Sequence, residues 1–243
     1  MLLSHAHLDH TVGLAFLADN IQSAQSAAGH PISITAASLG PVIDDLRAYC
    51  FNSRLRPDFT KLPSPGEPVR RRQTRREREA IEFGGVTVLP VPVHHSVPAT
   101  GFIIHDGATG VVFSGDTGPT ADIWKAAHEL KSIRAIIVES TFPNRLESLA
   151  TPAGHYTPAM LQREMEKMPD APLWIYHIKP AHFEETVEEL ERLGDRLHIL
   201  DQDRTHTFSP RPRHSRSAGG HERPRPLSVD PARKRSAHVP LQK

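Results

Sequence analysis

One short string near the start of the chain restricts its possible folds more than any other feature. It places three histidines and an aspartate within six positions, as His5-Ala6-His7-Leu8-Asp9-His10. Residues two apart in an extended segment point to the same side, so His5 and His7 can share one metal ion. Apolar residues then recur at positions 14, 17, 18 and 21, which predicts a helix. Asp9 and His10 therefore lie at the turn into that helix and can serve a second ion. A chance cluster of surface histidines is the alternative.

Segments typical of strands and helices alternate along the rest of the chain. Helices are expected at residues 11–28, 41–51, 121–130, 158–168 and 182–193, and strands at 32–36, 86–93, 101–105, 110–114, 133–138, 172–176 and 197–200. Residues 62–85 are expected to form a loop, with a helical turn or two between 71 and 81. Asp106-Gly107 separates two of the strands and is a strong hairpin signal. This alternation predicts an α/β layered fold.

Residues that can bind a metal ion follow three of the predicted strands. The pair His94-His95 follows strand 86–93, Asp116 follows strand 110–114, and His177 follows strand 172–176. Each of these residues alone is ordinarily a buried histidine or a turn aspartate. Together with the string at the start of the chain, they predict a metal centre with nitrogen and carboxylate ligands. Such ligands suit zinc, manganese or iron.

The order of these motifs resembles the signature of the metallo-β-lactamase superfamily. Four segments look like those of its class II 3′,5′-cyclic-nucleotide phosphodiesterases: His95-Ser96-Val97-Pro98, Ser114-Gly115-Asp116-Thr117, Glu139-Ser140-Thr141-Phe142 and Gly154-His155-Tyr156. The resemblance covers residues 3–208 and implies an α/β fold of the αββα sandwich type. It also selects His95 over His94, because the family's histidine commonly precedes a small residue.

The resemblance implies two divalent metal ions, with zinc favoured and manganese or iron as alternatives. The implied ligands are His5, His7 and His95 for one ion, Asp9, His10 and His177 for the other, and Asp116 between them. We also expect Asp9 to have a catalytic role. The related transfer-RNA 3′-processing endonucleases use a glutamate and a histidine that are not metal ligands, similar to Glu139 and His155. We therefore expect His155, oriented by Glu139, to be the general acid.

The implied reaction is hydrolysis of a 3′,5′-cyclic nucleotide to the nucleoside 5′-monophosphate. Two dications lower the pKa of a water molecule between them, and the resulting hydroxide attacks phosphorus. The sequence does not choose between cyclic AMP (cAMP) and cyclic GMP (cGMP). Two alternatives stay open. One is an RNA-processing endonuclease of the same superfamily, although no Gly/Pro-rich arm for transfer RNA is evident. The other is an inactive, truncated module for metal binding or interaction.

The position of the metal motif departs from the family pattern. In the family it follows several dozen residues that form the first strands, whereas here it begins at residue 5. We therefore expect residues 1–208 to be a phosphodiesterase-like domain that is incomplete at its N-terminus. The opening residues do not have the basic and apolar regions of a signal peptide, so the cytoplasm is the expected location. An export signal lost with the missing N-terminus is the alternative.

The C-terminal residues 209–243 differ in composition from the rest. They contain nine lysines and arginines but only one glutamate and one aspartate, and they are rich in proline and serine. Such a segment buries too little apolar surface to order itself, so we expect a disordered basic tail. We favour a solvated extension over a contact with nucleic acid.

Composition excludes several classes of protein. A single cysteine, Cys50, excludes both an intrachain disulfide framework and zinc sites of the cysteine type. No apolar run reaches the roughly 18–20 residues that a membrane span requires. The family resemblance implies a small-molecule cyclic nucleotide as the partner, and a homodimer is compatible with the sequence.

Overall fold

The structure is a computed structural model that describes residues 1–28, 30, 32–66, 68–201 and 203–208. The described residues all belong to one unit, Met1–Pro210. Most of the predicted strands and helices are found within a few residues of their expected bounds. The predicted disordered tail at 209–243 lies outside the described residues.

The larger sheet has seven strands in the order β3-β4-β5-β6-β7-β8-β9. They are β3 (Ile81–Phe83), β4 (Val86–Val93), β5 (Ala99–His105), β6 (Gly110–Phe113), β7 (Ile133–Glu139), β8 (Leu173–Tyr176) and β9 (Leu197–Ile199). Pairing is antiparallel from β3 to β6 and parallel from β6 to β9. The predicted hairpin joins β5 to β6, with Asp106 accepting the N–H of Thr109. Because β6, β7 and β8 are parallel, their carboxyl ends lie at one edge of the sheet.

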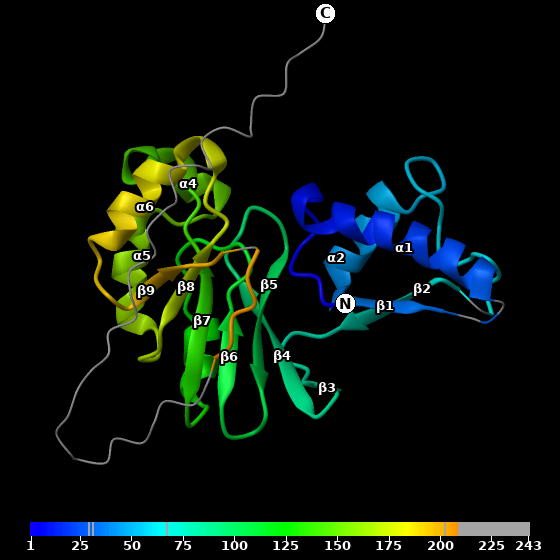
Figure 1. The fold of residues 1–243 in the computed structure, drawn as a ribbon, viewed down its shortest axis with the longest axis horizontal. Helices are drawn as coiled ribbons and strands as arrows, with labels where there is room; N and C mark the ends of the chain where they lie inside the picture. Colours follow the sequence, from blue (N-terminus) through cyan, green and yellow to red (C-terminus); the bar gives the residue numbers. More distant parts are fainter. Residues whose placement is uncertain (29, 31, 67, 202, 209–243) are drawn as a thin grey trace, which may run out of the picture. The chain divides into compact units, whose positions relative to one another are not determined.

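Helices pack on one face of this sheet (Figure 1). They are α3 (Asp122–His128), α4 (Glu147–Ala153), α5 (Pro158–Glu164) and α6 (Phe183–Glu191), with 3₁₀ turns at Asn144–Leu146, Met165–Lys167 and Pro180–His182. Helix α5 starts where the sequence predicts, because Thr157 caps it through the N–H of Met160 and Pro158 takes the first position. Alternate strand residues such as Ile136, Val138 and Ile175 point into this apolar core. We call residues 81–199 the sheet region.

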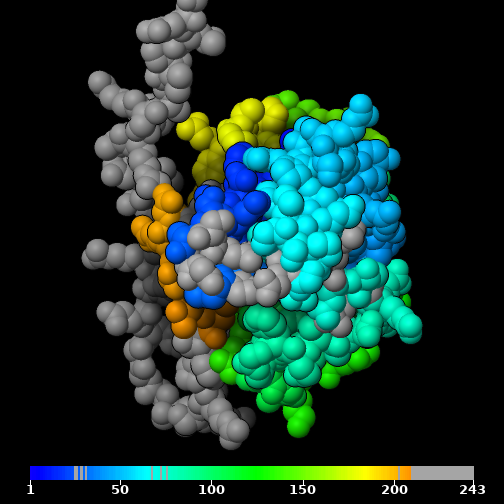
Figure 2. Space-filling view, turned by 90° about the vertical axis from the view of Figure 1, so that its right-hand side faces the viewer, coloured from blue at the N-terminus to red at the C-terminus, as the bar shows by residue number. Residues whose placement is uncertain are grey.

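Residues 1–75, here called the N-terminal region, contain a second sheet of two parallel strands (Figure 1). Figure 2 shows the blue and cyan surface of this region facing the viewer. The elements are α1 (Leu8–Ala28), β1 (Ile34–Leu39), α2 (Gly40–Asp45), a π-helical turn (Leu46–Cys50) and β2 (Arg70–Arg75). A separate apolar cluster that includes Leu14, Phe51 and Phe59 holds them together. The chain is thus an α/β protein with two sheets, as the sequence predicts. Within the described residues no helix is long and apolar enough to span a membrane.

Strand β2 corrects the expectation of a loop or helical turns at residues 62–85. Its sequence is rich in arginine, which hid the strand, but it pairs in parallel with β1 from Ile34 to Leu39. Arg70 is fully buried, and its guanidinium lies 4.1 Å from the centre of the Phe51 ring, a cation–π contact. Backbone pairing with β1 and the contact between Arg70 and Phe51 therefore stabilise this strand despite the positive charge of its arginines. Strand β3 and helix α4 were also not predicted.

The first residues of the chain link the two sheets. The N–H of Leu3 donates to the carbonyl of Ala37 in β1 at 3.0 Å. The carbonyl of Ser4 accepts the N–H of Thr100 in β5, also at 3.0 Å. This segment therefore runs between β1 and β5 and delivers the next residue, His5, to the edge of the larger sheet. Helix α1 begins at Leu8, three residues earlier than expected, so Asp9 and His10 lie in its first turn.

Candidate metal centre

The seven predicted metal ligands converge at the carboxyl edge of the larger sheet. Four come from the string that enters α1, and three come from the loops after β4, β6 and β8. Their atoms form the groups His5–His7–His95 and Asp9–His10–His177, within each of which all the potential ligand atoms lie within 4.8 Å of one another. These are the groups that the family resemblance implies. The assignment of each residue as a ligand stays a prediction.

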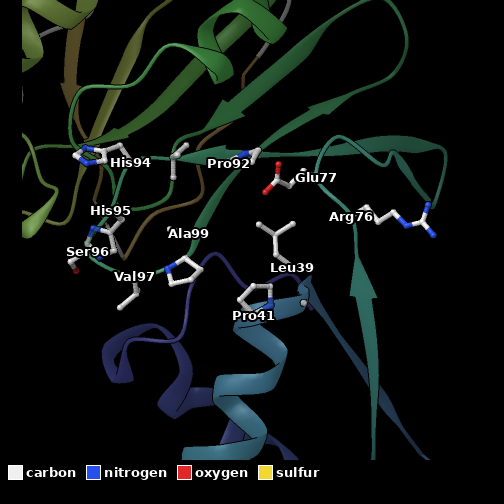
Figure 3. A pocket seen from close by; sticks show the side chains of 13 residues that line it. Leu39, Pro41, Arg76, Glu77, Pro92, His94, His95, Ser96, Val97 and Ala99 are labelled. Atoms are coloured by element: carbon white, nitrogen blue, oxygen red, sulfur yellow. The ribbon is translucent and has the colours of Figure 1, made fainter.

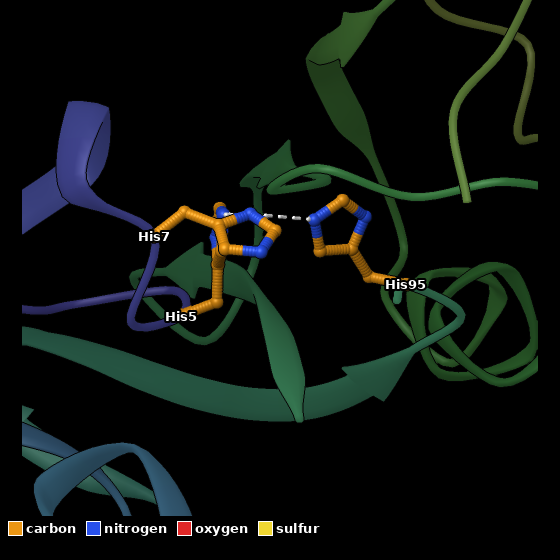
Figure 4. A group of neighbouring side chains, drawn as sticks. All are labelled: His5, His7 and His95. Atoms are coloured by element: carbon orange, nitrogen blue, oxygen red, sulfur yellow. Dashed lines mark hydrogen bonds between the residues drawn. The ribbon is translucent and has the colours of Figure 1, made fainter. Parts of the chain in front are cut away.

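The first group has the spacing of ligands around one ion (Figure 4). His7 Nδ1 lies 3.1 Å from His5 Nε2 and 3.1 Å from His95 Nε2. Two nitrogens bound tetrahedrally to zinc at about 2.0–2.1 Å are separated by about 3.3 Å. Three histidine nitrogens that all lie within 4.8 Å of one another, two of the pairs at 3.1 Å, therefore fit a single metal ion.

The second group is more open to solvent. His10 Nε2 and His177 Nε2 lie 3.4 Å apart, and Asp9 Oδ2 lies 3.6 Å from His177 Nε2. The Asp9 side chain is 59% exposed because it stands on the first turn of α1. Two nitrogens and a carboxylate oxygen fit a second divalent ion.

Asp116 lies between the two groups and is fully buried. Its Oδ2 is 3.1 Å from His10 Nε2, 3.4 Å from His177 Nε2 and 3.9 Å from His5 Nε2. Burial alone would raise the pKa of this carboxyl, but the hydrogen bond that it accepts from His10 outweighs burial and holds the pKa far below its ordinary value. Asp116 is therefore an anion at neutral pH that can bridge two cations.

Burial also keeps several of the histidines uncharged. It lowers the pKa of His5 to about 3, with His10 adding to the effect. Burial likewise lowers the pKa of His95 and of His177. His10 differs, because its hydrogen bond to Asp116 outweighs burial and raises its pKa. Neutral imidazole is the form that binds a metal ion, so the environment favours binding by His5, His95 and His177.

Gly154 orients one ligand through its backbone. Its carbonyl can only accept, so the contact of 2.9 Å requires His95 to donate from Nδ1. Nε2 of a neutral His95 is then free to bind metal. Gly154 ends α4 in the left-handed conformation with φ +69°, and a Cβ there would lie 2.7 Å from the Cα of His95. Only glycine allows this approach.

Glu139 and His155 form a pair next to the ligands. His155 Nδ1 lies 2.7 Å from Glu139 Oε1, and Glu139 is fully buried. Burial alone would lower the pKa of His155, but the hydrogen bond and charge of Glu139 outweigh it and raise the pKa. One nitrogen of His155 lies within 4.8 Å of ligand atoms of both Asp116 and His95. The geometry is compatible with the predicted role of His155 as a general acid oriented by Glu139, and that role stays a prediction.

Sequence reasoning missed the polar groups that hold the ligands in place. Ser4 Oγ lies 3.1 Å from His5 Nδ1, Tyr176 donates its hydroxyl to Asp116 Oδ1 at 3.4 Å, and Thr141 Oγ lies 2.9 Å from His177 Nδ1. For Ser4 and Tyr176 the available signal was sequence adjacency to a ligand. For Thr141 it was the spacing of two residues from Glu139, which puts both side chains on one side of an extended segment.

A cavity of about 770 Å³ adjoins the candidate metal centre (Figure 3). Its lining includes His95 and Ser96 and the apolar side chains of Val97 and Pro41. Glu77 points into it from the loop after β2. His94, which was not chosen as a ligand, has an exposed side chain and also lines this cavity.

Comparison with known proteins identifies the relatives of the chain. The family described as "Beta-lactamase superfamily domain" matches residues 1–201. A protein of Yersinia pestis named "Probable 3',5'-cyclic-nucleotide phosphodiesterase" is 28% identical over 206 residues, which cover 74% of this chain and 56% of that protein. The chain thus spans little more than half the length of this curated relative.

Solved structures share the fold. Unliganded yeast PDE1 superposes with a TM-score of 0.67 at 21% identity, over 82% of this chain and 64% of that chain. The metallo-β-lactamase fold protein YhfI from Bacillus subtilis gives 0.60 at 18% identity, over 82% and 73%. The short form of human tRNase Z gives 0.55 at 17% identity, over 86% and 78%. At these identities the likeness establishes the fold alone.

Proposed function

The chain belongs to the β-lactamase superfamily, and on that premise we propose that it is a metal-dependent phosphodiesterase that converts 3′,5′-cyclic nucleotides to nucleoside 5′-monophosphates. The observation that carries the proposal is the pair of three-residue ligand groups on either side of Asp116. The name of the Yersinia pestis relative supports the choice of substrate class. Zinc is our proposed metal because it accepts this nitrogen-rich donor set, with manganese and iron as alternatives.

Different residues of the chain would have different roles in the proposed reaction. His5, His7 and His95 would hold one ion, Asp9, His10 and His177 the other, and Asp116 both. When bound, two divalent ions supply Lewis-acid activation of a phosphoryl oxygen and of the attacking water. The ammonium of Lys179 acts electrostatically on Asp9, His155 and His177, so it is placed to attract the phosphate.

His155 supplies the proton that the leaving group needs. Its Nδ1–H donates to Glu139, which leaves Nε2 to carry the transferable proton. Water oxygen bonds to phosphorus, the P–O3′ bond breaks, and the proton of His155 passes to O3′. A proton from the attacking water then restores His155. Glu139 raises the pKa of His155, so the protonated form is available near neutral pH.

The cavity beside His95 gives room for the nucleoside. We propose that a substrate whose phosphate lies against the ligand groups extends its sugar and base past Ser96 toward Val97. The volume of about 770 Å³ is within the range of small-molecule sites. Apolar side chains would contact the faces of the base, and the exposed Glu77 carboxylate would accept hydrogen bonds from it.

Metal content and product identity test the proposal together. The purified chain is dialysed against trace zinc and analysed for metal, then incubated with cAMP, cGMP and a transfer-RNA precursor. We expect about two ions per chain, the number of ligand groups, and release of the 5′-monophosphate. Cleavage of the RNA without hydrolysis of either cyclic nucleotide would favour the endonuclease alternative. A chain without stoichiometric metal would contradict the proposal.

A further inference from the structure

Thr141 occupies a central position that the proposed reaction does not use. It lies two residues after Glu139, just beyond the end of β7, and is fully buried. Its Oγ is 2.6 Å from Glu139 Oε2, 2.9 Å from His177 Nδ1 and 3.2 Å from His155 Nδ1. One hydroxyl therefore touches the proton-donating pair and a predicted metal ligand at once.

The direction of each hydrogen bond follows from the groups involved. An ionised carboxylate only accepts, so Thr141 gives its single hydroxyl proton to Glu139. The Thr141 oxygen can then only accept, and His177 must donate to it from Nδ1. A neutral imidazole carries one proton, so Nε2 of His177 is left unprotonated. That Nε2 lies 3.4 Å from both His10 Nε2 and Asp116 Oδ2.

Hydrogen bonds hold the Glu139 carboxylate in place and so preserve its contact with the Thr141 hydroxyl. Its Oε1 accepts the N–H of Thr117 at 2.8 Å, and its Oε2 accepts the N–H of Tyr156 at 3.3 Å. Two backbone donors thus fix the carboxylate, and the remaining contacts go to His155 and Thr141. The orientation of the Thr141 hydroxyl is set by the backbone around Glu139.

We infer that Thr141 is a positioning residue that fixes the Nδ1–H tautomer of His177 and so strengthens the metal site formed with Asp9 and His10. This inference rests on the proposed metal-dependent function. It predicts that the group His5–His7–His95 keeps its affinity when the Thr141 hydroxyl is removed, because His5 and His95 have other polar partners, Ser4 and the Gly154 carbonyl. Groups of this kind change metal affinity by about 10–100-fold.

The tautomer of His177 can be measured without metal or activity. Long-range ¹H–¹⁵N spectra of the metal-free chain near neutral pH are recorded for the wild type, T141V and T141S, with His177 assigned from H177N. We expect Nδ1–H in the wild type and T141S, and loss of that preference in T141V, which keeps the shape but not the hydroxyl. T186V is the matched control, because Thr186 is equally buried and its Oγ has no hydrogen-bond partner among the described residues.

Titration with Co²⁺ gives the second readout. We expect T141V to lower the affinity of one of two sites by about 10–100-fold, while T141S and T186V match the wild type. Unchanged tautomer and affinities in T141V, or an equal loss in T141S, would overturn the inference. A wild-type chain that binds no Co²⁺ would instead refute the proposed metal centre, and the tautomer comparison would still decide the role of Thr141.

Discussion

The N-terminal region and the sheet region differ in the size of their apolar clusters and in the number of large apolar side chains that they expose. The core cluster of the sheet region contains 19 buried residues, against 9 in the N-terminal region. Of the 11 large apolar side chains that are exposed in the described residues, 8 lie in the N-terminal region. Because burial of apolar surface is the main stabilising contribution, the smaller region depends more on its contacts with the larger one.

Both regions contribute residues to the candidate site, but not to every part of it. His5, His7, Asp9 and His10 come from the N-terminal region, and the other predicted ligands come from the sheet region. The pair Glu139–His155 and Thr141 belong entirely to the sheet region. Metal binding should therefore need both regions, whereas the geometry of the acid should need only one. The following variants test this contrast.

The largest effect is expected from D116A. Asp116 faces histidines of both ligand groups, so its loss should remove both ions and abolish hydrolysis. The decrease in metal affinity should exceed the roughly 10–100-fold that loss of a residue supporting a ligand produces. Elemental analysis and the cyclic-nucleotide assay measure both. D122N, an exposed aspartate on α3, is the control. Retention of two ions by D116A would show that Asp116 does not join the groups.

H155Q should separate the acid from the metal centre. Loss of a general acid lowers kcat by about 10²–10⁴-fold, while metal content should stay at the wild-type level because His155 is not among the proposed ligands. Steady-state kinetics and elemental analysis on the same preparation give both values. H128Q alters an exposed histidine and should change neither. If H155Q loses metal in proportion to activity, His155 is a ligand instead.

Core variants compare the two regions directly. Leu14 on α1 and Leu190 on α6 are both fully buried, in different clusters. L14A and L190A should each lower the free energy of unfolding by about 2–5 kcal/mol. Only L14A should also weaken metal binding, because α1 carries Asp9 and His10 in its first turn. Denaturant unfolding and Co²⁺ titration test this. Equal loss of metal affinity in both variants would show that the regions act as one unit.

V97W should have the smallest effect. A larger side chain at this position narrows the cavity beside His95 without touching a proposed ligand. KM for the cyclic nucleotide should rise roughly tenfold, equivalent to about 1.4 kcal/mol of binding, with kcat and metal content unchanged. V97A, which leaves the cavity open, should retain the wild-type KM. An unaltered KM in V97W would place the nucleoside elsewhere.

The difference between the N-terminal region and the sheet region also explains which elements of the fold could be predicted from the sequence. Strands β4 to β8 were found because their apolar, β-branched residues are buried in a sheet and so leave a local pattern. Strand β2 was missed because its identity depends on pairing with β1 and on a buried arginine, neither of which is visible locally. Helix α4 is short and contains Pro152, so it carries no clear helical pattern.

For the candidate site, residue types were predictable and their supports were not. Histidine and aspartate residues at the ends of predicted strands indicate a metal site even when the order of the strands in the sheet is not known. Thr141 acts through His177, which is 36 residues away, and the Gly154 carbonyl acts through His95, which is 59 residues away. Such contacts exist only after the strands are ordered in space.

Gly154 has a consequence for how the history of this protein family can be followed. The backbone at this position excludes any side chain, and the same residue orients His95 and directly precedes His155. Selection for folding and selection for chemistry therefore act on one codon. A relative that has lost catalysis should still retain this glycine, because the fold requires it, while its histidines diverge. A relative that has the glycine but not the histidines would therefore have kept the fold and lost the reaction.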